Sequence, residues 1–171
     1  TSPHSLESIP SERGKQNNGY SIPFLAKNKN GYENLCKLSS LGFTKGFYYV
    51  PRIDKEQLLN FKSDLIVTTG GLQGEIPSLI LNVGEDQAEE AFLWYKEQFG
   101  EDFYVELNRH SLPEEDHVNT ILLKFAKKHG VNYFAANNNY YIDKKSSDAH
   151  DVLLCVKDGV QKDIPIGKGR G

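Results

Sequence analysis

The stretch FYVELNRHSLPEEDHVNTILLKFAKKHG (residues 103–130) contains one complete strand, turn and helix. Its first five residues, 103–107, form an apolar run that a single acidic residue interrupts, as is typical of a buried β-strand. Residues 111–114 (SLPE) have the form of a capping box, which predicts that a helix starts there. Apolar residues then recur at helical spacing until Gly130: Val118, Ile121, Leu122 and Phe125. The stretch therefore predicts a strand followed directly by an amphipathic helix.

Three more apolar runs have the length of buried strands, namely residues 22–26, 65–69 and 131–136. Pro23 weakens the first prediction, because proline has no N–H to donate within a sheet. These runs alternate with amphipathic stretches, which indicates an α/β fold with a parallel sheet. Four such units are too few to close a barrel, so we expect that a partner segment is missing.

Three further helices are predicted. Residues 86–99 place their apolar side chains in one helical stripe and leave acidic residues outside it. Asp54 is a favourable first residue for a short helix, and Ser147 begins a last helix that ends before Gly159.

The two ends of the chain have compositions unlike the rest. Residues 1–18 are rich in polar residues and have no periodic apolar face, so we expect a mobile N-terminal loop. Residues 164–171 are predicted to form a linker or tail. The chain contains no methionine and begins with threonine, which indicates a processed or internal piece of a longer protein.

Charge and apolar content exclude several classes of protein. The formal net charge is −3, from 20 basic and 23 acidic residues, so no broad positive face for gripping DNA is predicted. No apolar run approaches the length that crosses a bilayer, and no secretory signal is present, so we expect a cytoplasmic protein. Cys36 and Cys155 lack metal-ligand spacing and are expected to be reduced.

Ligands in parallel α/β sheets meet the residues just beyond the carboxyl ends of the strands. His110 is the one residue at these places that suits a metal or a general base, but its spacing favours polar packing or a place in the turn before the helix. Glu106 interrupts an apolar strand, so it either pairs internally or points into a site. The acidic residues 114–116 are expected only to stabilise the start of their helix. Residues 137–141 (NNNYY) favour a turn.

Several motifs resemble the PHP (polymerase and histidinol phosphatase) domain of the bacterial DNA polymerase III alpha subunit. The resemblance runs from about residue 19 to residue 163, which we take as a partial PHP domain. The motifs that carry it are FLAKN (24–28), GYENL (31–35), GFYYVPRID (46–54), GEIP (74–77), FYVELNRH (103–110) and DAHDVLLC (148–155).

The resemblance implies a portion of a distorted seven-stranded β/α barrel, whose strand ends can hold a cluster of metals. The early strands, which carry an H-x-H motif in the family, are expected to be missing from this chain. Metal-binding members have Asn-Asp-x-His-Tyr where this chain has Asn138 and Tyr140 in place of the carboxylate and the imidazole. They often carry cysteine at the position of Gly71, whereas Glu106 and His110 match positions that remain. These five residues are predicted to form a vestigial cleft. No catalytic residue and no cofactor are predicted there, and none of the five is assigned as a metal ligand.

Two functional hypotheses follow from this resemblance. The first is a degenerate PHP domain that acts as a structural and interaction module of a DNA-directed DNA polymerase, a nucleotidyltransferase of DNA replication. Its partners would be the remainder of the polymerase chain and the proofreading exonuclease or other replisome subunits, with DNA reached only through the parent chain. The alternative is an active phosphoesterase that uses divalent metal on nucleotide 3′ ends or pyrophosphate. An unrelated α/β small-molecule binding domain is a third reading that the motifs disfavour.

Overall fold

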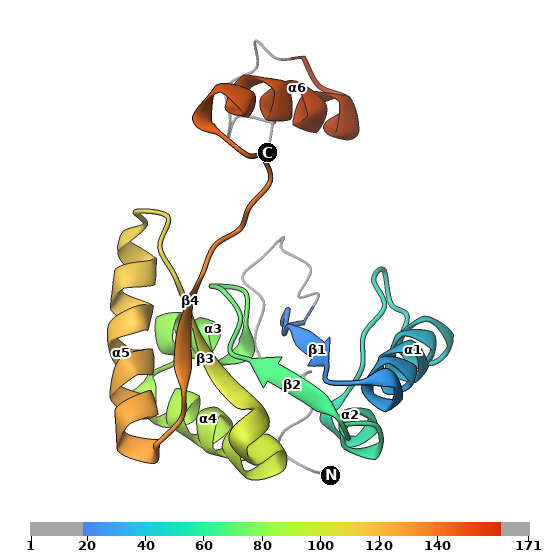
Figure 1. Cartoon of the computed structure of the whole chain (residues 1–171), viewed down its shortest axis with the longest axis vertical. Helices are drawn as coiled ribbons and strands as arrows, with labels where there is room; N and C mark the ends of the chain where they lie inside the picture. The colour runs from blue at the N-terminus through green and yellow to red at the C-terminus, as the bar shows by residue number, and fades with distance from the viewer. Residues whose placement is uncertain (1–18, 162–171) are drawn as a thin grey trace. The chain divides into compact units, whose positions relative to one another are not determined.

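The structure, a computed structural model, describes residues 19–161, and the chain divides after Ala136 into two units (Figure 1). The first unit contains β1 (Phe24–Ala26), α1 (Lys29–Thr44), α2 (Lys55–Asn60), β2 (Leu65–Thr68), α3 (Glu75–Asn82), α4 (Glu85–Phe99), the 3-10 helix η1 (Gly100–Asp102), β3 (Phe103–Asn108), α5 (Pro113–His129) and β4 (Tyr133–Ala136). The second contains the 3-10 helix η2 (Lys144–Ser146) and α6 (Ser147–Asp158). The predicted loop over residues 1–18 and the predicted tail over residues 164–171 lie outside the described residues.

The four strands form one sheet in the order β1-β2-β3-β4. The pairs β2–β3 and β3–β4 are parallel, as predicted. The prediction is wrong for β1, which runs antiparallel to β2 with Phe24 opposite Val67 and Ala26 opposite Leu65. A short apolar run specifies a strand but not its direction, because side chains alternate with the same period in both arrangements. The strand also starts after Pro23 and is mostly exposed, as an edge strand can be.

The helix over residues 113–129 forms as predicted, but its predicted capping box is wrong. Leu112 is the N-cap, and Ser111 lies outside the helix with φ +63°. Pro113 explains the difference. Proline suits the first helical position and pushes the preceding residue into an extended conformation, which Leu112 adopts with ψ 130°. By contrast, the Asp54 cap is confirmed, since its side chain accepts a hydrogen bond of 2.7 Å from the Gln57 N–H.

Two helices, α1 and α3, were not predicted from sequence. Glycine dilutes the apolar pattern of α1, yet the fold needs it there. A Cβ on Gly31 would lie 2.2 Å from the Asp64 carbonyl oxygen, so only glycine lets α1 pack this closely against the residue that precedes β2. Similarly, a Cβ on Gly74 at the start of α3 would lie 2.1 Å from the Thr69 carbonyl oxygen. Tertiary packing rather than local propensity determines these two helices.

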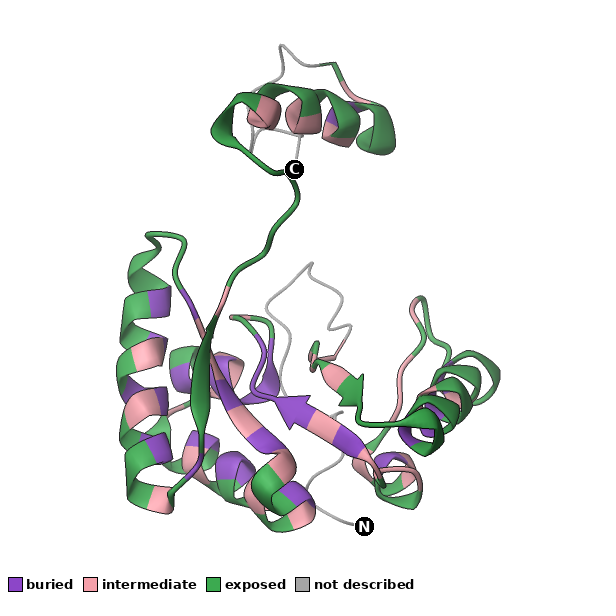
Figure 2. Ribbon diagram, viewed as in Figure 1, coloured by how far each residue is buried: buried purple, intermediate pink, exposed green. Residues whose placement is uncertain are grey.

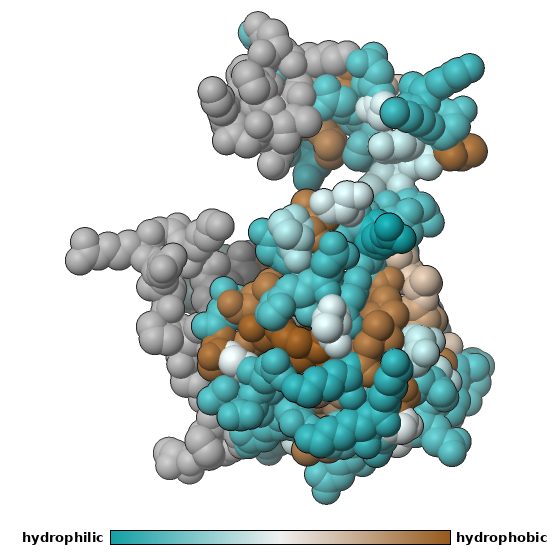
Figure 3. Space-filling model, turned by 90° about the vertical axis from the view of Figure 1, so that its left-hand side faces the viewer, coloured by the Kyte–Doolittle hydropathy of each residue, from teal (hydrophilic) through white to brown (hydrophobic). Residues whose placement is uncertain are grey.

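The core of the first unit lies between the sheet and helices α3, α4 and α5. Figure 2 shows buried residues along β2 and β3 and on the inner sides of these helices, whereas β4 is largely exposed. Phe92 of α4 is fully buried at the centre, with its ring 5.0 Å from that of Phe103 and 5.6 Å from that of Phe125. The face that carries α5 is mostly hydrophilic, with hydrophobic residues reaching the surface between hydrophilic ones (Figure 3).

The second unit is built around α6. This helix begins at Ser147 and ends at Asp158, with Gly159 in the left-handed conformation after it, as predicted. The rings of Tyr140 and Tyr141 lie 5.3 and 5.4 Å from that of His150. Among the residues that the structure describes in either unit, no helix is long and apolar enough to span a bilayer.

Candidate functional site

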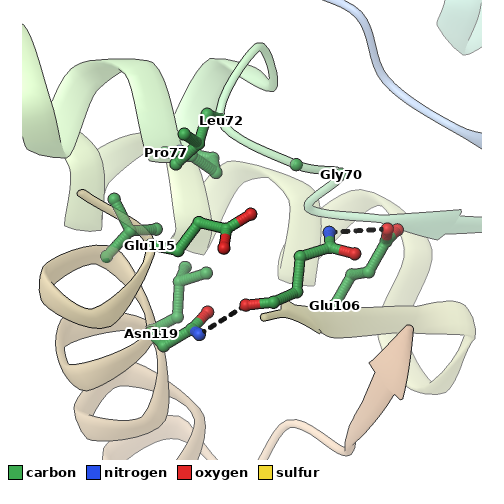
Figure 4. Close-up of a pocket in the computed structure, with 10 residues that line it drawn as sticks. Gly70, Leu72, Pro77, Glu106, Glu115 and Asn119 are labelled. Carbon is green, nitrogen blue, oxygen red and sulfur yellow. Dashed lines mark hydrogen bonds between the residues drawn. The ribbon is translucent and has the colours of Figure 1, made fainter. Parts of the chain in front are cut away.

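A small recess lies at the carboxyl ends of β2 and β3, where parallel α/β sheets place their ligands. The loop after β2, the end of β3, and helices α3 and α5 line it (Figure 4): Gly70, Gly71, Leu72, Pro77, Glu106, Asn108, Glu115, Val118, Asn119 and Leu122. Its volume of about 10 Å³ leaves room for roughly one water molecule or ion.

Glycines form the loop that closes one side of this recess. Gly70 has φ +69°, and its N–H donates to the hydroxyl of Thr68 at 3.2 Å. Gly71 follows it and faces β3. A Cβ on Gly71 would lie 3.5 Å from the side-chain nitrogen of Asn108, which is an ordinary contact distance. A Cβ at position 71 would therefore fit beside Asn108.

The carboxylate of Glu106 is held by two neighbouring side chains. One oxygen accepts a hydrogen bond of 2.7 Å from the Thr68 hydroxyl, and the other accepts one of 3.0 Å from the amide nitrogen of Asn108. The backbone N–H of Glu106 donates to the Thr69 hydroxyl. Glu106 thus pairs internally, as one of the two alternatives predicted, and it also lines the recess.

His110 contacts Glu115, which lines the recess. The ring Nδ1 of His110 and one carboxylate oxygen of Glu115 lie 2.6 Å apart, and the backbone N–H of His110 donates to the other oxygen. Burial acts to raise the pKa of Glu115, but these hydrogen bonds from His110 outweigh it and lower the pKa below its usual value. The pair anchors the first turn of α5 to the end of β3, as a turn residue would.

Asn108 has one polar atom without a partner. Its amide nitrogen donates to Glu106, and its backbone oxygen accepts from the amide of Asn119 at 2.8 Å. The side-chain oxygen is buried and has no hydrogen bond among the described residues, and the whole residue is only 7% exposed. A buried acceptor of this kind normally has a partner such as a water molecule.

The structure brings some of the predicted site residues together. Gly71 and Glu106 line the same recess, and His110 joins it through Glu115. Asn138 and Tyr140 belong to the second unit, where the Asn137 amide donates to the Asn139 side chain.

Sequence reasoning did not identify Asn108, Glu115 or Asn119 as site residues. Asn108 could have been found, because it follows Glu106 by two positions and alternate residues of a strand point to the same face. Glu115 was expected only to stabilise the start of its helix. It also contributes a buried carboxylate to the recess, and no local pattern signals this.

A cluster of divalent ions needs several side-chain ligands close together. Within residues 19–161, no group of three or more His, Cys, Asp or Glu side chains could hold a metal ion. Glu106 and Glu115 are the carboxylates that line the recess, and each already accepts hydrogen bonds through both oxygens. The described residues do not fit a site for two or three ions, which requires several anionic ligands.

Comparison with known proteins gives consistent matches over most of the chain. A family model described as "PHP domain" matches residues 6–110, which include Gly71, Glu106 and His110. "DNA polymerase III subunit alpha" of Borreliella burgdorferi is 42% identical over 143 residues, covering 84% of this chain and 12% of the relative. The proteins of the same name from Deinococcus radiodurans and Thermus aquaticus are each 38% identical, covering 81% and 90% of this chain. The chain spans only 10% to 13% of the length of these relatives.

Proposed function

The chain belongs to the PHP domain family, and we propose that it serves as a structural and interaction module within a DNA polymerase III alpha subunit, with a degenerate metal site. In this proposal the parent chain polymerises DNA during replication, and these residues contribute no catalytic group.

One observation supports this proposal most strongly: both carboxylates that line the recess already accept hydrogen bonds from neighbouring residues. Thr68 and Asn108 hold Glu106, while His110 holds Glu115, so both carboxylates stabilise the local fold. A metal ion would have to displace these hydrogen bonds, and the lining offers no imidazole or thiolate in return. The resemblance implies that Asn138 and Tyr140 stand where metal-binding members have a carboxylate and an imidazole, so these two positions provide neither a carboxylate nor an imidazole.

The sheet offers a surface for the proposed partners. Strand β4 stands at one end of the described sheet, and most of its residues are exposed, including Tyr133 and Phe134. An edge with unpaired N–H and C=O groups readily accepts another strand. We propose that the remainder of the polymerase chain covers this edge, and that a proofreading exonuclease or another replisome subunit binds elsewhere on the module.

One observation favours the alternative of an active phosphoesterase. The unpaired side-chain oxygen of Asn108 and the two carboxylates all line the same recess, and oxygen ligands of this kind suit a divalent ion. Such an enzyme would act on nucleotide 3′ ends or on pyrophosphate.

A hydrolysis assay separates the two proposals. With Mn²⁺ or Zn²⁺ present, we expect this chain to release no more phosphate from pyrophosphate, or nitrophenol from bis(4-nitrophenyl) phosphate, than the buffer does. Glu106→Gln provides the matched variant, because it removes the charge and keeps the shape of the side chain. If the chain hydrolysed a substrate in a metal-dependent way and Glu106→Gln abolished this activity, the alternative would be established. The proposal of a module without a catalytic role would then be rejected.

A further inference from the structure

Four large aromatic side chains are exposed together at the end of α1 and in the loop that follows it. Phe43, Phe47, Tyr48 and Tyr49, here called the aromatic platform, are 57% to 64% exposed. The loop lies toward the β1 end of the sheet, whereas α5 lies toward the other end (Figure 1). Single exposed apolar residues are ordinary, but a cluster of four within seven positions marks a binding surface.

The platform is ordered by contacts among its own rings. The rings of Phe43 and Phe47 stack with centroids 6.2 Å apart, and those of Tyr48 and Tyr49 meet edge to face at 4.7 Å. The guanidinium of Arg52 lies 5.2 Å from the centre of the Tyr48 ring and donates to the Tyr48 carbonyl oxygen at 3.2 Å. The rings are therefore held in position while large parts of them remain open to solvent.

The backbone of the loop is shaped to present these rings. Tyr49 adopts φ +62°, a left-handed conformation that is unfavourable for a bulky residue. The N–H of Arg52 donates to the Gly46 carbonyl oxygen, and a Cβ on Gly46 would lie 1.8 Å from the Arg52 carbonyl oxygen. Unfavourable conformations persist where the surrounding structure enforces them, and they cluster at functional sites.

The stretch of sequence that carries the platform differs in charge from the whole chain. Residues 34–53 contain three basic side chains, Lys37, Lys45 and Arg52, and no acidic one. The complete chain has 23 acidic residues in 171, so this stretch of 20, which lies between Glu33 and Asp54, has more positive charge than the chain as a whole. The net charge of −3, from which no broad positive face for gripping DNA is predicted, conceals this basic stretch.

From these observations, we propose that the aromatic platform binds single-stranded nucleic acid. Proteins that bind single strands combine basic side chains along the backbone with aromatic rings on which bases stack, and both are present here. Binding of a protein partner would also bury the aromatic rings, but it would not explain why residues 34–53 contain no acidic side chain. The inference does not rest on the proposed function, because it concerns a surface of this chain and not the recess.

Fluorescence anisotropy with a labelled oligodeoxythymidine of about 20 nucleotides tests this inference on the whole chain. We expect binding at about 50 mM salt that weakens steeply by about 200 mM, and weaker binding to a duplex of equal length. Tyr49→Asn removes a ring while keeping a residue that tolerates the left-handed backbone, and Phe47→Leu removes a ring but keeps an apolar side chain. Each should weaken binding by about fivefold or more, which is the smallest effect of losing one stacked base.

Two further variants complete the test. Lys45→Gln should weaken binding and make the slope of log affinity against log salt shallower by about 0.7. Tyr141→Asn makes the same chemical change at an exposed tyrosine of the second unit and should leave binding unchanged. Thermal melting of each variant confirms that it folds. The inference is overturned if no oligonucleotide binds at low salt, or if the ring variants bind as tightly as the parent chain. It is also overturned if Phe47→Leu retains full affinity while Lys45→Gln loses it, since charge alone would then account for binding.

Discussion

Replacing Phe92 with alanine is expected to lower the free energy of unfolding of the first unit by about 3 to 5 kcal/mol. The side chain is fully buried in α4 and packs against Phe103 of β3, Phe125 of α5 and the ring of His129. Removing the ring takes away the free energy gained by burying it and leaves a cavity between α4, β3 and α5. Such a loss is comparable to the whole stability of many domains, so the variant should be largely unfolded at 37 °C.

Urea unfolding followed by tryptophan fluorescence measures this effect. Trp94 is the single tryptophan of the chain and lies in α4, so its emission reports on the first unit. Leu93→Ala is the matched control, because Leu93 is the next residue of the same helix and is 43% exposed. The control should change stability by about 1 kcal/mol at most. Equal losses for the two variants would show that Phe92 does not lie at the centre of the core.

Replacing Glu75 with alanine is expected to cost about 3 kcal/mol. Glu75 is buried at the start of α3, where it accepts hydrogen bonds of 2.7 Å from the Lys55 ammonium and the Tyr95 hydroxyl. Burial, together with the adjacent Glu75 carboxylate, raises the pKa of Tyr95, so the hydroxyl stays protonated and donates. The variant would leave this buried hydroxyl without its acceptor and the Lys55 ammonium without its counterion.

The matched control for Glu75 is an exposed ion pair of similar length. Glu85 and Lys124 lie 2.6 Å apart, but water reaches both side chains, so Glu85→Ala should cost about 1 kcal/mol or less. Urea midpoints of the two variants give the comparison. If Glu75→Ala lowered the free energy of unfolding no more than Glu85→Ala did, the buried network between α2, α3 and α4 would not contribute to stability as described.

The sequence alone was sufficient for the elements whose signals are local. The β3–α5 unit follows from one apolar strand and one strongly periodic helix, and Asp54 caps α2 through a hydrogen bond between residues three positions apart. The direction of a strand and the contacts between elements depend on distant parts of the chain. The antiparallel pairing of β1 and the close approach of Gly31 to Asp64 are of this kind, and no local pattern encodes them.

The same distinction applies to the recess. Glu106 could be predicted because an acidic residue inside an apolar strand needs a partner or a site. Its partner Thr68 lies 38 residues earlier in the chain, so the pairing becomes visible only in the folded structure. Glu115 looked like one of several acids at the start of a helix, and its burial against His110 depends on the turn that Pro113 imposes.

Titration of Mn²⁺ and Zn²⁺ into this chain, followed by calorimetry, tests the central claim of a degenerate metal site most directly. We expect no site with a stoichiometry near one, and the same weak heats for the chain and for Glu106→Gln, because the recess carboxylates are already engaged. One or more stoichiometric ions bound by this chain and lost in Glu106→Gln would contradict the claim.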